Sequence, residues 1–199
     1  MPIRLTDISL RYREKQVLAN FNLTLPEQGV VCFFGPSGCG KTSLLRILAG
    51  LTTPNSGEVS GLAGLKTAVV FQENRLLPWL SAIDNIALVL PKDSYDVAYY
   101  WLEQVELSLE ADKLPRQLSG GMQRRLALAR ALAYEGDLLL LDEPFTGLDS
   151  ALAKRLLYLI SKLYAEKLVV MVTHDQALSQ LADQVYVVDG PPLSLTGVD

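Results

Sequence analysis

Eight residues at positions 35–42 have the types and the spacing of a loop that binds phosphate. The stretch Gly35-Pro36-Ser37-Gly38-Cys39-Gly40-Lys41-Thr42 fits the pattern G-x-x-x-x-G-K-[ST]. Glycines allow successive backbone N–H groups to turn toward phosphate oxygens, and the N-terminus of a following helix adds a positive dipole end. Lys41 is predicted to reach the β- and γ-phosphates and Thr42 to ligate Mg²⁺, with Ser43 completing the site. The stretch therefore predicts a site for a nucleoside triphosphate.

The residues on either side of the loop favour this interpretation over an ordinary glycine-rich turn. A β-branched and aromatic run occupies positions 30–34, and an apolar-periodic stretch occupies positions 43–50. The sequence thus predicts a strand, the loop and a helix in succession, which is the context that the motif requires.

Two carboxylates follow an apolar run farther along the chain. Four leucines at 138–141 predict a buried parallel strand, and Asp142 and Glu143 come directly after it. Ligands of open α/β sheets bind at the carboxyl ends of strands. Asp142 there suits Mg²⁺, directly or through water, and Glu143 suits a general base that polarises the attacking water. The alternative for this pair alone is an ordinary acidic turn after a strand.

A third stretch whose residues could bind a ligand is Leu118-Ser119-Gly120-Gly121-Met122, which precedes an expected helix. A serine and two glycines at a helix start form a second phosphate-binding device, or else a loop that ends in an N-cap. One chain has one P-loop, so a second phosphate-binding device in the same molecule would be redundant.

Taken in order, these motifs resemble those of the ATP-binding subunits of bacterial ABC transporters. The resemblance covers nearly the whole chain and makes 118–122 the family's signature, with Met122 standing where glutamine is commonest. It implies ATP and Mg²⁺ as ligands. It also implies a head-to-tail homodimer, in which ATP lies between the P-loop of one subunit and the signature of the other.

Four further residues take roles from the resemblance. His174 would contact the γ-phosphate and hold Glu143 and the water in place, and Asp149 would belong to the D-loop. Gln72 would touch Mg²⁺ and the water and report the nucleotide state to a membrane partner. Tyr12 would stack on adenine, although a tyrosine in a strand also serves in cross-strand packing.

Composition narrows the classes of function. The chain of 199 residues has a net charge of −4, a pI near 5.1 and scattered basic residues, so we expect no nucleic-acid partner. Arg124 and Arg125 are interpreted as a solvated helix face. Cys32 and Cys39 are not expected to form a disulfide, and Cys39 is interpreted as a small side chain rather than a redox switch. Without an apolar span or signal peptide, the protein is expected to stay in the cytoplasm. The resemblance implies that it binds peripherally at the cytoplasmic face of the inner membrane.

The order of the elements predicts an α/β fold, a P-loop NTPase core with an antiparallel β subdomain at the N-terminus and an inserted small helical subdomain. The prediction is a single domain over 1–199, with the core and β subdomain at 1–72 and 118–199 and the helical subdomain at 73–117. Residues 3–12 and 17–25 are predicted to pair as antiparallel strands, residues 53–57 to form a loop, and a strand at 185–188 to close the chain.

The segment at 72–81 is similar to the corresponding segment of ATPases that serve importers of nitrate, sulfonates, taurine and thiamine-precursor pyrimidines. This likeness implies transmembrane permease subunits and, indirectly, a periplasmic or lipid-anchored solute-binding protein. An ATPase of an exporter or of a lipoprotein-release system is the alternative. Leu76, Leu77, Trp79 and Leu80 are predicted to form a groove for a short permease helix, or else to fill the core of the helical subdomain.

Overall fold

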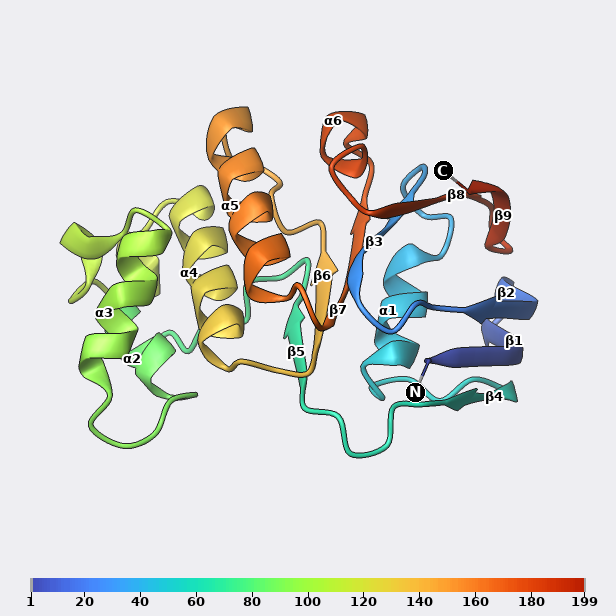
Figure 1. The fold of residues 1–199 in the computed structure, drawn as a ribbon, viewed down its shortest axis with the longest axis horizontal. Coiled ribbons are helices and arrows are strands. Elements are labelled where there is room, and N and C mark those ends of the chain that lie inside the picture. Colours follow the sequence, from blue (N-terminus) through green and yellow to red (C-terminus); the bar gives the residue numbers. More distant parts are fainter. Residues whose placement is uncertain (1, 199) are drawn as a thin grey trace.

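The computed structural model describes residues 2–198, which form two sheets and a block of helices (Figure 1). The strands are β1 Arg4–Tyr12, β2 Lys15–Thr24, β3 Gly29–Phe34, β4 Ser56–Ser60, β5 Thr67–Val70, β6 Leu138–Asp142, β7 Leu168–Thr173, β8 Gln184–Asp189 and β9 Ser194–Val198. The α-helices are α1 Lys41–Leu48, α2 Ala82–Ala87, α3 Tyr95–Gln104, α4 Gly120–Ala133, α5 Ser150–Leu163 and α6 Gln176–Ser179.

The larger sheet has the strand order β5-β6-β7-β3-β8-β9, and all pairs are parallel except β8 with β9. Both of its faces are covered, which is why its central strands are continuous apolar runs. Side chains of β3 alternate between the two faces. Val30 and Cys32 pack in the cluster that contains α4 and α5, whereas Val31 and Phe33 pack in the cluster that contains α1. Figure 1 shows α1 between this sheet and the smaller one.

The smaller sheet is antiparallel, with the order β2-β1-β4. Its strands β1 and β2 follow the predicted positions, but the predicted loop at 53–57 is wrong in its last two residues, because β4 begins at Ser56. Only one of the five residues of β4 is even partly buried, so it carries no apolar alternation. Its place depends on pairing with β1, which is 44 or more residues earlier in the chain and invisible to a local pattern.

The chain does not end with the strand predicted at 185–188. That strand is present as β8, and β9 then returns antiparallel to it, with Asp189 opposite Ser194 and Tyr186 opposite Val198. The residues of β9 are mostly exposed and include serine, threonine and glycine. An edge strand of this kind is recognised by its hydrogen-bonded neighbour and not by its own residues.

Residues 73–117 contain α2, α3 and two short 3₁₀ turns, Ser108–Glu110 and Pro115–Gln117. Helices α2 and α3 pack against α4, and the buried residues Ile86, Trp101 and Leu102 belong to the same cluster as the sheet. The division at 73 and 117 stays a prediction, and its outer limits, 1 and 199, lie outside the described residues. Within 2–198, every helix falls short of the length and apolar character needed to cross a bilayer.

The connection from β5 to α2 is ordered by one fully buried asparagine. The side-chain amide of Asn85 donates to the carbonyls of Leu77, Leu80 and Ser81, and its oxygen accepts from the backbone N–H of Leu77 at 2.9 Å. Leu77 and Leu80 are half-buried as a result, Leu76 packs on the core, and of the predicted groove residues only Trp79 is largely exposed, at 71%.

We expect Asn85→Ala to lower the free energy of unfolding by about 2–4 kcal/mol, because it leaves buried carbonyls and an N–H without partners. Urea denaturation followed by circular dichroism measures the change. The matched control is Leu109→Ala in the same helical block, where the side chain is 95% exposed; it should stay within about 0.5 kcal/mol of the wild type. Equal stability of the two variants would show that Asn85 does not hold the connection.

Candidate nucleotide-binding and catalytic site

A cavity of about 600 Å³ lies at the carboxyl ends of the central strands. It is lined by residues from stretches that are far apart in the sequence, namely Tyr12, Lys15, Val17, the P-loop, Gln72, Arg124, Asp142, Glu143, Thr146 and His174. The fold therefore gathers the predicted P-loop, glutamine, two carboxylates and histidine around one space. Lys15 and Val17 also line it, although their sequence context gave no chemical signal.

The P-loop connects β3 to α1, and its glycines are required by its shape. A Cβ atom at Gly35 would lie 2.1 Å from the backbone oxygen of Val188, which no side chain tolerates. Gly40 directly precedes α1 and has a φ angle of 123°, which L side chains rarely adopt. The loop thus curls tightly onto the N-terminus of α1, where free backbone N–H groups and the helix dipole favour an anion.

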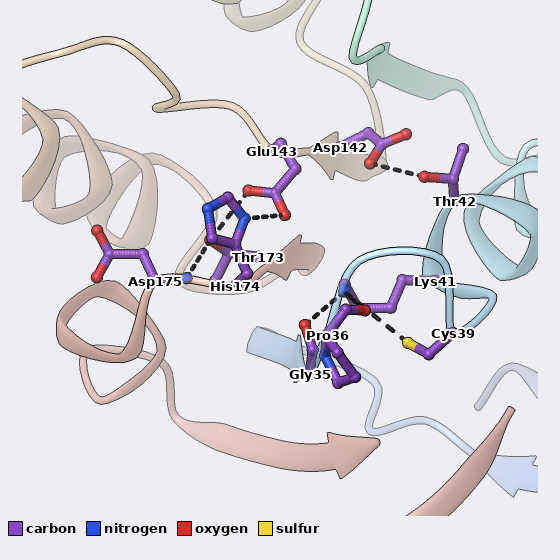
Figure 2. A network of polar contacts seen from close by, with 10 residues as sticks. All are labelled: Gly35, Pro36, Cys39, Lys41, Thr42, Asp142, Glu143, Thr173, His174 and Asp175. Atoms are coloured by element: carbon purple, nitrogen blue, oxygen red, sulfur yellow. Dashed lines mark hydrogen bonds and ion pairs between the residues drawn. The ribbon is translucent and has the colours of Figure 1, made fainter. Parts of the chain in front are cut away.

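Lys41 lies inside this curl and is only 6% exposed. Its ammonium donates to the carbonyls of Gly35 at 2.6 Å and Pro36 at 2.8 Å, and the sulfur of Cys39 is 3.9 Å away (Figure 2). Cys39 is fully buried beside it and acts as a packed side chain of the loop. The loop therefore holds a positive charge among its own backbone groups, at the place where the sequence predicts phosphate.

Thr42 and Asp142 are in contact in the wall of the cavity. The Thr42 hydroxyl donates to Oδ1 of Asp142 at 3.1 Å, and the Asp142 carboxylate, at the end of β6, is 4% exposed (Figure 2). Burial raises the pKa of Asp142, the Thr42 hydrogen bond lowers it in part, and the charge of Glu143 raises it again. Two neighbouring hard oxygens in a desolvated place are a donor set that suits Mg²⁺.

Glu143 is held at both of its carboxylate oxygens by the end of β7. Oε1 lies 2.8 Å from Nδ1 of His174, and Oε2 accepts from the Thr173 hydroxyl at 3.2 Å (Figure 2). The Thr173 oxygen in turn accepts from the backbone N–H of Asp175 at 3.0 Å. The backbone of Glu143 has a φ of 49°, which is uncommon outside glycine. A strained backbone and two side-chain contacts thus fix where this carboxylate points.

Thr173 was missed by reasoning from the sequence. Its neighbour His174 carried the signal, whereas a threonine at the end of an apolar strand is ordinary. The pairing of β6 with β7 places Asp142 opposite Val172, and this register brings Thr173 to Glu143.

The signature and the D-loop residue lie apart from the cavity. Ser119 and Gly120 are exposed, and the Ser119 hydroxyl accepts from the N–H of Met122 as the N-cap of α4. Asp149 similarly caps α5 by accepting from the N–H of Leu152 at 2.9 Å. A Cβ at Gly121 would lie 3.3 Å from the oxygen of Gly147, so the signature and the turn before Asp149 are neighbours. Neither lines the cavity within one chain.

The predicted solvated face at Arg124 and Arg125 is wrong. Arg124 is 6% exposed, and its guanidinium donates to the carbonyls of Phe71 at 2.5 Å and Gln72 at 2.8 Å. Arg125 donates to the carbonyls of Val105 and Glu106. Both side chains turn inward because carbonyls just after β5 and α3 face α4 and need hydrogen-bond donors. The spacing of charged residues along the sequence does not show where these carbonyls lie.

Comparison with known proteins identifies the family. The family model described as "ABC transporter" matches residues 18–146. The chain belongs to the ABC transporter family. The aliphatic sulfonates import ATP-binding protein SsuB of Burkholderia pseudomallei is 41% identical over 194 residues, which are 94% of this chain and 59% of that protein. The SsuB 1 protein of Shouchella clausii is 38% identical, covering 98% of this chain and 81% of the relative.

Solved structures of the family share the fold. A dimeric post-hydrolysis state of the ATP-binding cassette MJ0796 bound to ADP and Pi has a TM-score of 0.90 at 30% identity, covering 99% of this chain and 97% of that one. A second dimeric structure of MJ0796 has a TM-score of 0.86 at 32% identity, with 93% of each chain covered. The predicted α/β fold with a P-loop NTPase core is thereby confirmed. This ABC chain spans about three fifths of the length of its Burkholderia relatives.

We expect Asp142→Asn to stabilise the nucleotide-free ABC protein at pH 7. Burial raises the pKa of Asp142, so the folded state is disfavoured wherever that carboxylate is ionised. The asparagine oxygen can still accept from Thr42. The gain should be complete above the raised pKa of the folded state and should vanish as pH falls to the ordinary value near 3.8.

Thermal melts of both proteins between pH 3.5 and 8 measure this difference. Ser56→Ala on the exposed edge strand β4 serves as the control, because its offset from the wild type should not vary with pH. A constant offset for Asp142→Asn as well would show that the burial of this carboxylate does not govern stability.

Proposed function

We propose that this chain binds ATP with Mg²⁺ and hydrolyses it to energise solute uptake by an ABC transporter. The observation that carries the proposal is the fixed carboxylate of Glu143, held by His174 and Thr173 beside the P-loop lysine. A base, a cation-binding pair and a phosphate cradle around one cavity are the parts that phosphoryl transfer to water requires.

The residues present fit the nucleotide and the ion. The P-loop from Gly35 to Ser43 would bind the phosphates through its N–H groups and Lys41, and Tyr12, 43% exposed at the rim, would stack on adenine. Thr42 and Asp142, with the amide of Gln72, would hold Mg²⁺. When bound, the ion neutralises charge on the β- and γ-phosphates.

Glu143 would act as the general base. Its carboxylate accepts the proton of the attacking water, and His174 and Thr173 keep it from rotating away. The contact with Nδ1 leaves the other ring nitrogen, Nε2, for the γ-phosphate. The carboxylate is preorganised, because its orientation is fixed before the substrate binds.

Completion of the site requires a second copy of the chain. Ser119 and Gly120 of the predicted signature at 118–122 are exposed, and no residue of this stretch lines the cavity of its own subunit. An N-terminal helix turn that carries a serine and two glycines suits phosphate, so we place it against ATP bound by a partner in a head-to-tail homodimer. The related cassette MJ0796 forms dimers in its solved structures.

The transported solute is proposed from the relatives. Those at 38–41% identity are named aliphatic sulfonates import ATP-binding proteins. We therefore place this chain at the cytoplasmic face of the inner membrane, bound to transmembrane permease subunits through the face that carries Trp79. A periplasmic or lipid-anchored binding protein would deliver a small solute such as a sulfonate, nitrate or a pyrimidine. Loss of efflux in a deletion strain, with uptake unchanged, would instead favour an exporter.

We expect Glu143→Gln to bind ATP but to hydrolyse it roughly 10²–10⁴-fold more slowly, because the general base is lost while the hydrogen-bonding shape remains. Phosphate release measures the rate, and a fluorescent ATP analogue measures binding. The control is Glu166→Gln, an exposed residue outside this cavity, which should turn over normally. Near-normal hydrolysis by Glu143→Gln would remove this residue from the role of base.

Dimerisation should depend on nucleotide. In the Glu143→Gln background, ATP should convert the protein from monomer to dimer, since ATP completes two interfaces at once. Light scattering with ATP, with ADP and without nucleotide measures the mass. Adding Ser119→Arg, which places a bulky side chain on the exposed signature, should abolish the dimer while ATP still binds. A monomer at saturating ATP would contradict the sandwich arrangement.

A further inference from the structure

The main chain that carries Gln72 is attached to helix α4 by two arginines. Arg124 donates to the carbonyls of Phe71 and Gln72, at 2.5 and 2.8 Å. Arg130, six residues farther along α4, donates to the carbonyls of Asn74 and Arg75, at 3.3 and 2.9 Å. Four carbonyls of a five-residue segment are thus bound by one helix.

The contacts of Arg124 and Arg130 differ in burial and in hydrogen-bond length. Arg124 is almost fully buried, and its two terminal nitrogens donate separately to two successive carbonyls, in the fixed fork of a planar guanidinium. Arg130 also donates to Asn85, so it shares its hydrogen bonds among three acceptors at up to 3.4 Å. Arg124 is therefore the shorter and tighter of the two attachments.

Arg124 lies beside the groups that are proposed to carry out catalysis. It lines the nucleotide cavity together with Gln72, Asp142 and Glu143. Burial lowers the pKa of its guanidinium, while the charges of Asp142 and Glu143 act in the opposite direction. The group stays cationic at neutral pH, since an arginine side chain loses its proton only at strongly basic pH. A desolvated cation held by two carbonyls resists displacement, because moving it would leave all three groups unpaired.

Helix α4 also carries the signature. It begins at Gly120, with Ser119 as its N-cap, so Arg124 lies little more than one helical turn from the exposed serine. Because Arg124 binds the main chain at Phe71 and Gln72, a displacement there would pull on the N-terminal part of α4. The exposed turn at 119–121 moves with that helix, because a regular helix of 14 residues is stiff on this scale.

We propose that Arg124 couples the nucleotide cavity of one subunit to the signature that the same subunit presents to a second copy. The coupling rests on the proposed function, in which Gln72 responds to bound nucleotide and the signature meets the partner's ATP. Arg124 is a positioning residue in this account. It acts through the main chain at Gln72, and it makes occupancy of one cavity set the position of the group that completes the other cavity.

A double-mutant cycle tests the coupling. We expect Arg124→Gln to lower kcat about tenfold or more, because the signature turn no longer follows Gln72. In a Gln72→Ala background the same change should alter the rate by less than about twofold, since the link then has nothing to transmit. Independent, multiplicative losses in the double variant would show a merely structural role and overturn the proposal.

Two further variants sharpen the cycle. Arg116→Gln removes an exposed arginine close to the signature and should leave the rate unchanged. Arg124→Lys keeps the charge but replaces the two terminal nitrogens by a single nitrogen one bond nearer the helix, so it should lose coupling as Arg124→Gln does. It replaces that variant if the glutamine protein does not fold. Full activity of Arg124→Lys would overturn the two-carbonyl link.

A second readout does not depend on hydrolysis. In the Glu143→Gln background, Arg124→Lys should raise the ATP concentration needed for half-maximal dimerisation about tenfold, whereas Arg116→Gln should not change it. If the wild type hydrolyses no ATP, the proposed function fails, and this dimer assay still decides the coupling. An unchanged dimerisation midpoint for Arg124→Lys would contradict the inference by itself.

Discussion

The parallel register of β6, β7 and β3 is the constraint on which the site depends. In this register Asp142 lies opposite Val172, and Phe34 lies opposite Thr173, so the three strands end at nearly the same level. The P-loop, the two carboxylates and the histidine each begin where a strand ends. Because parallel strands share one hydrogen-bonded frame, a slip of one strand would separate Glu143 from both of its partners.

This arrangement keeps charged groups in a place where water is scarce. Lys41, Asp142 and Arg124 are each at least nine-tenths buried, and each is satisfied by backbone carbonyls or a hydroxyl. A buried charge without such partners would be strongly destabilising. Burial and the charge of Glu143 raise the pKa of Asp142 although Thr42 donates a hydrogen bond to it. A site that is electrostatically unfavourable alone is well suited to bind a cation and a polyphosphate.

Burial also affects a thiol near this site. Burial raises the pKa of Cys32 on β3 to about 12, with the charge of Glu143 acting in the same direction. The group therefore stays a neutral thiol at neutral pH and serves the core between β3 and the helices.

Helix α4 connects the parts of the molecule. Its apolar residues belong to the cluster shared by the sheet and by α2 and α3. Its N-cap presents the signature, and Arg124, Arg125 and Arg130 bind carbonyls at the ends of β5 and α3 and in the segment between β5 and α2. Helix α4 is therefore in contact with both the sheet and the helical block. Its apolar residues are spread around the helix instead of forming one stripe, as expected for a helix that contacts protein on several sides.

The sequence by itself determined the features that are coded locally. The P-loop needs glycines at fixed offsets, as the φ angle of 123° at Gly40 shows, and the run of four leucines before Asp142 marks the strand β6. Ser119, a predicted N-cap, caps α4 by accepting from the N–H of Met122, three positions later. Such short-range constraints are readable because the partners lie within one turn of each other.

Only the tertiary structure decided features whose partners are distant in the chain. The edge strands β4 and β9 lack an apolar pattern and exist through pairing with β1 and β8. Thr173 reaches Glu143 across 30 residues, and Arg124 reaches Phe71 across 53. The chemistry of an arginine or a threonine is the same in solvent and in a buried contact. Which of the two occurs depends on where the fold leaves unpaired acceptors, and that is a property of packing and not of local sequence.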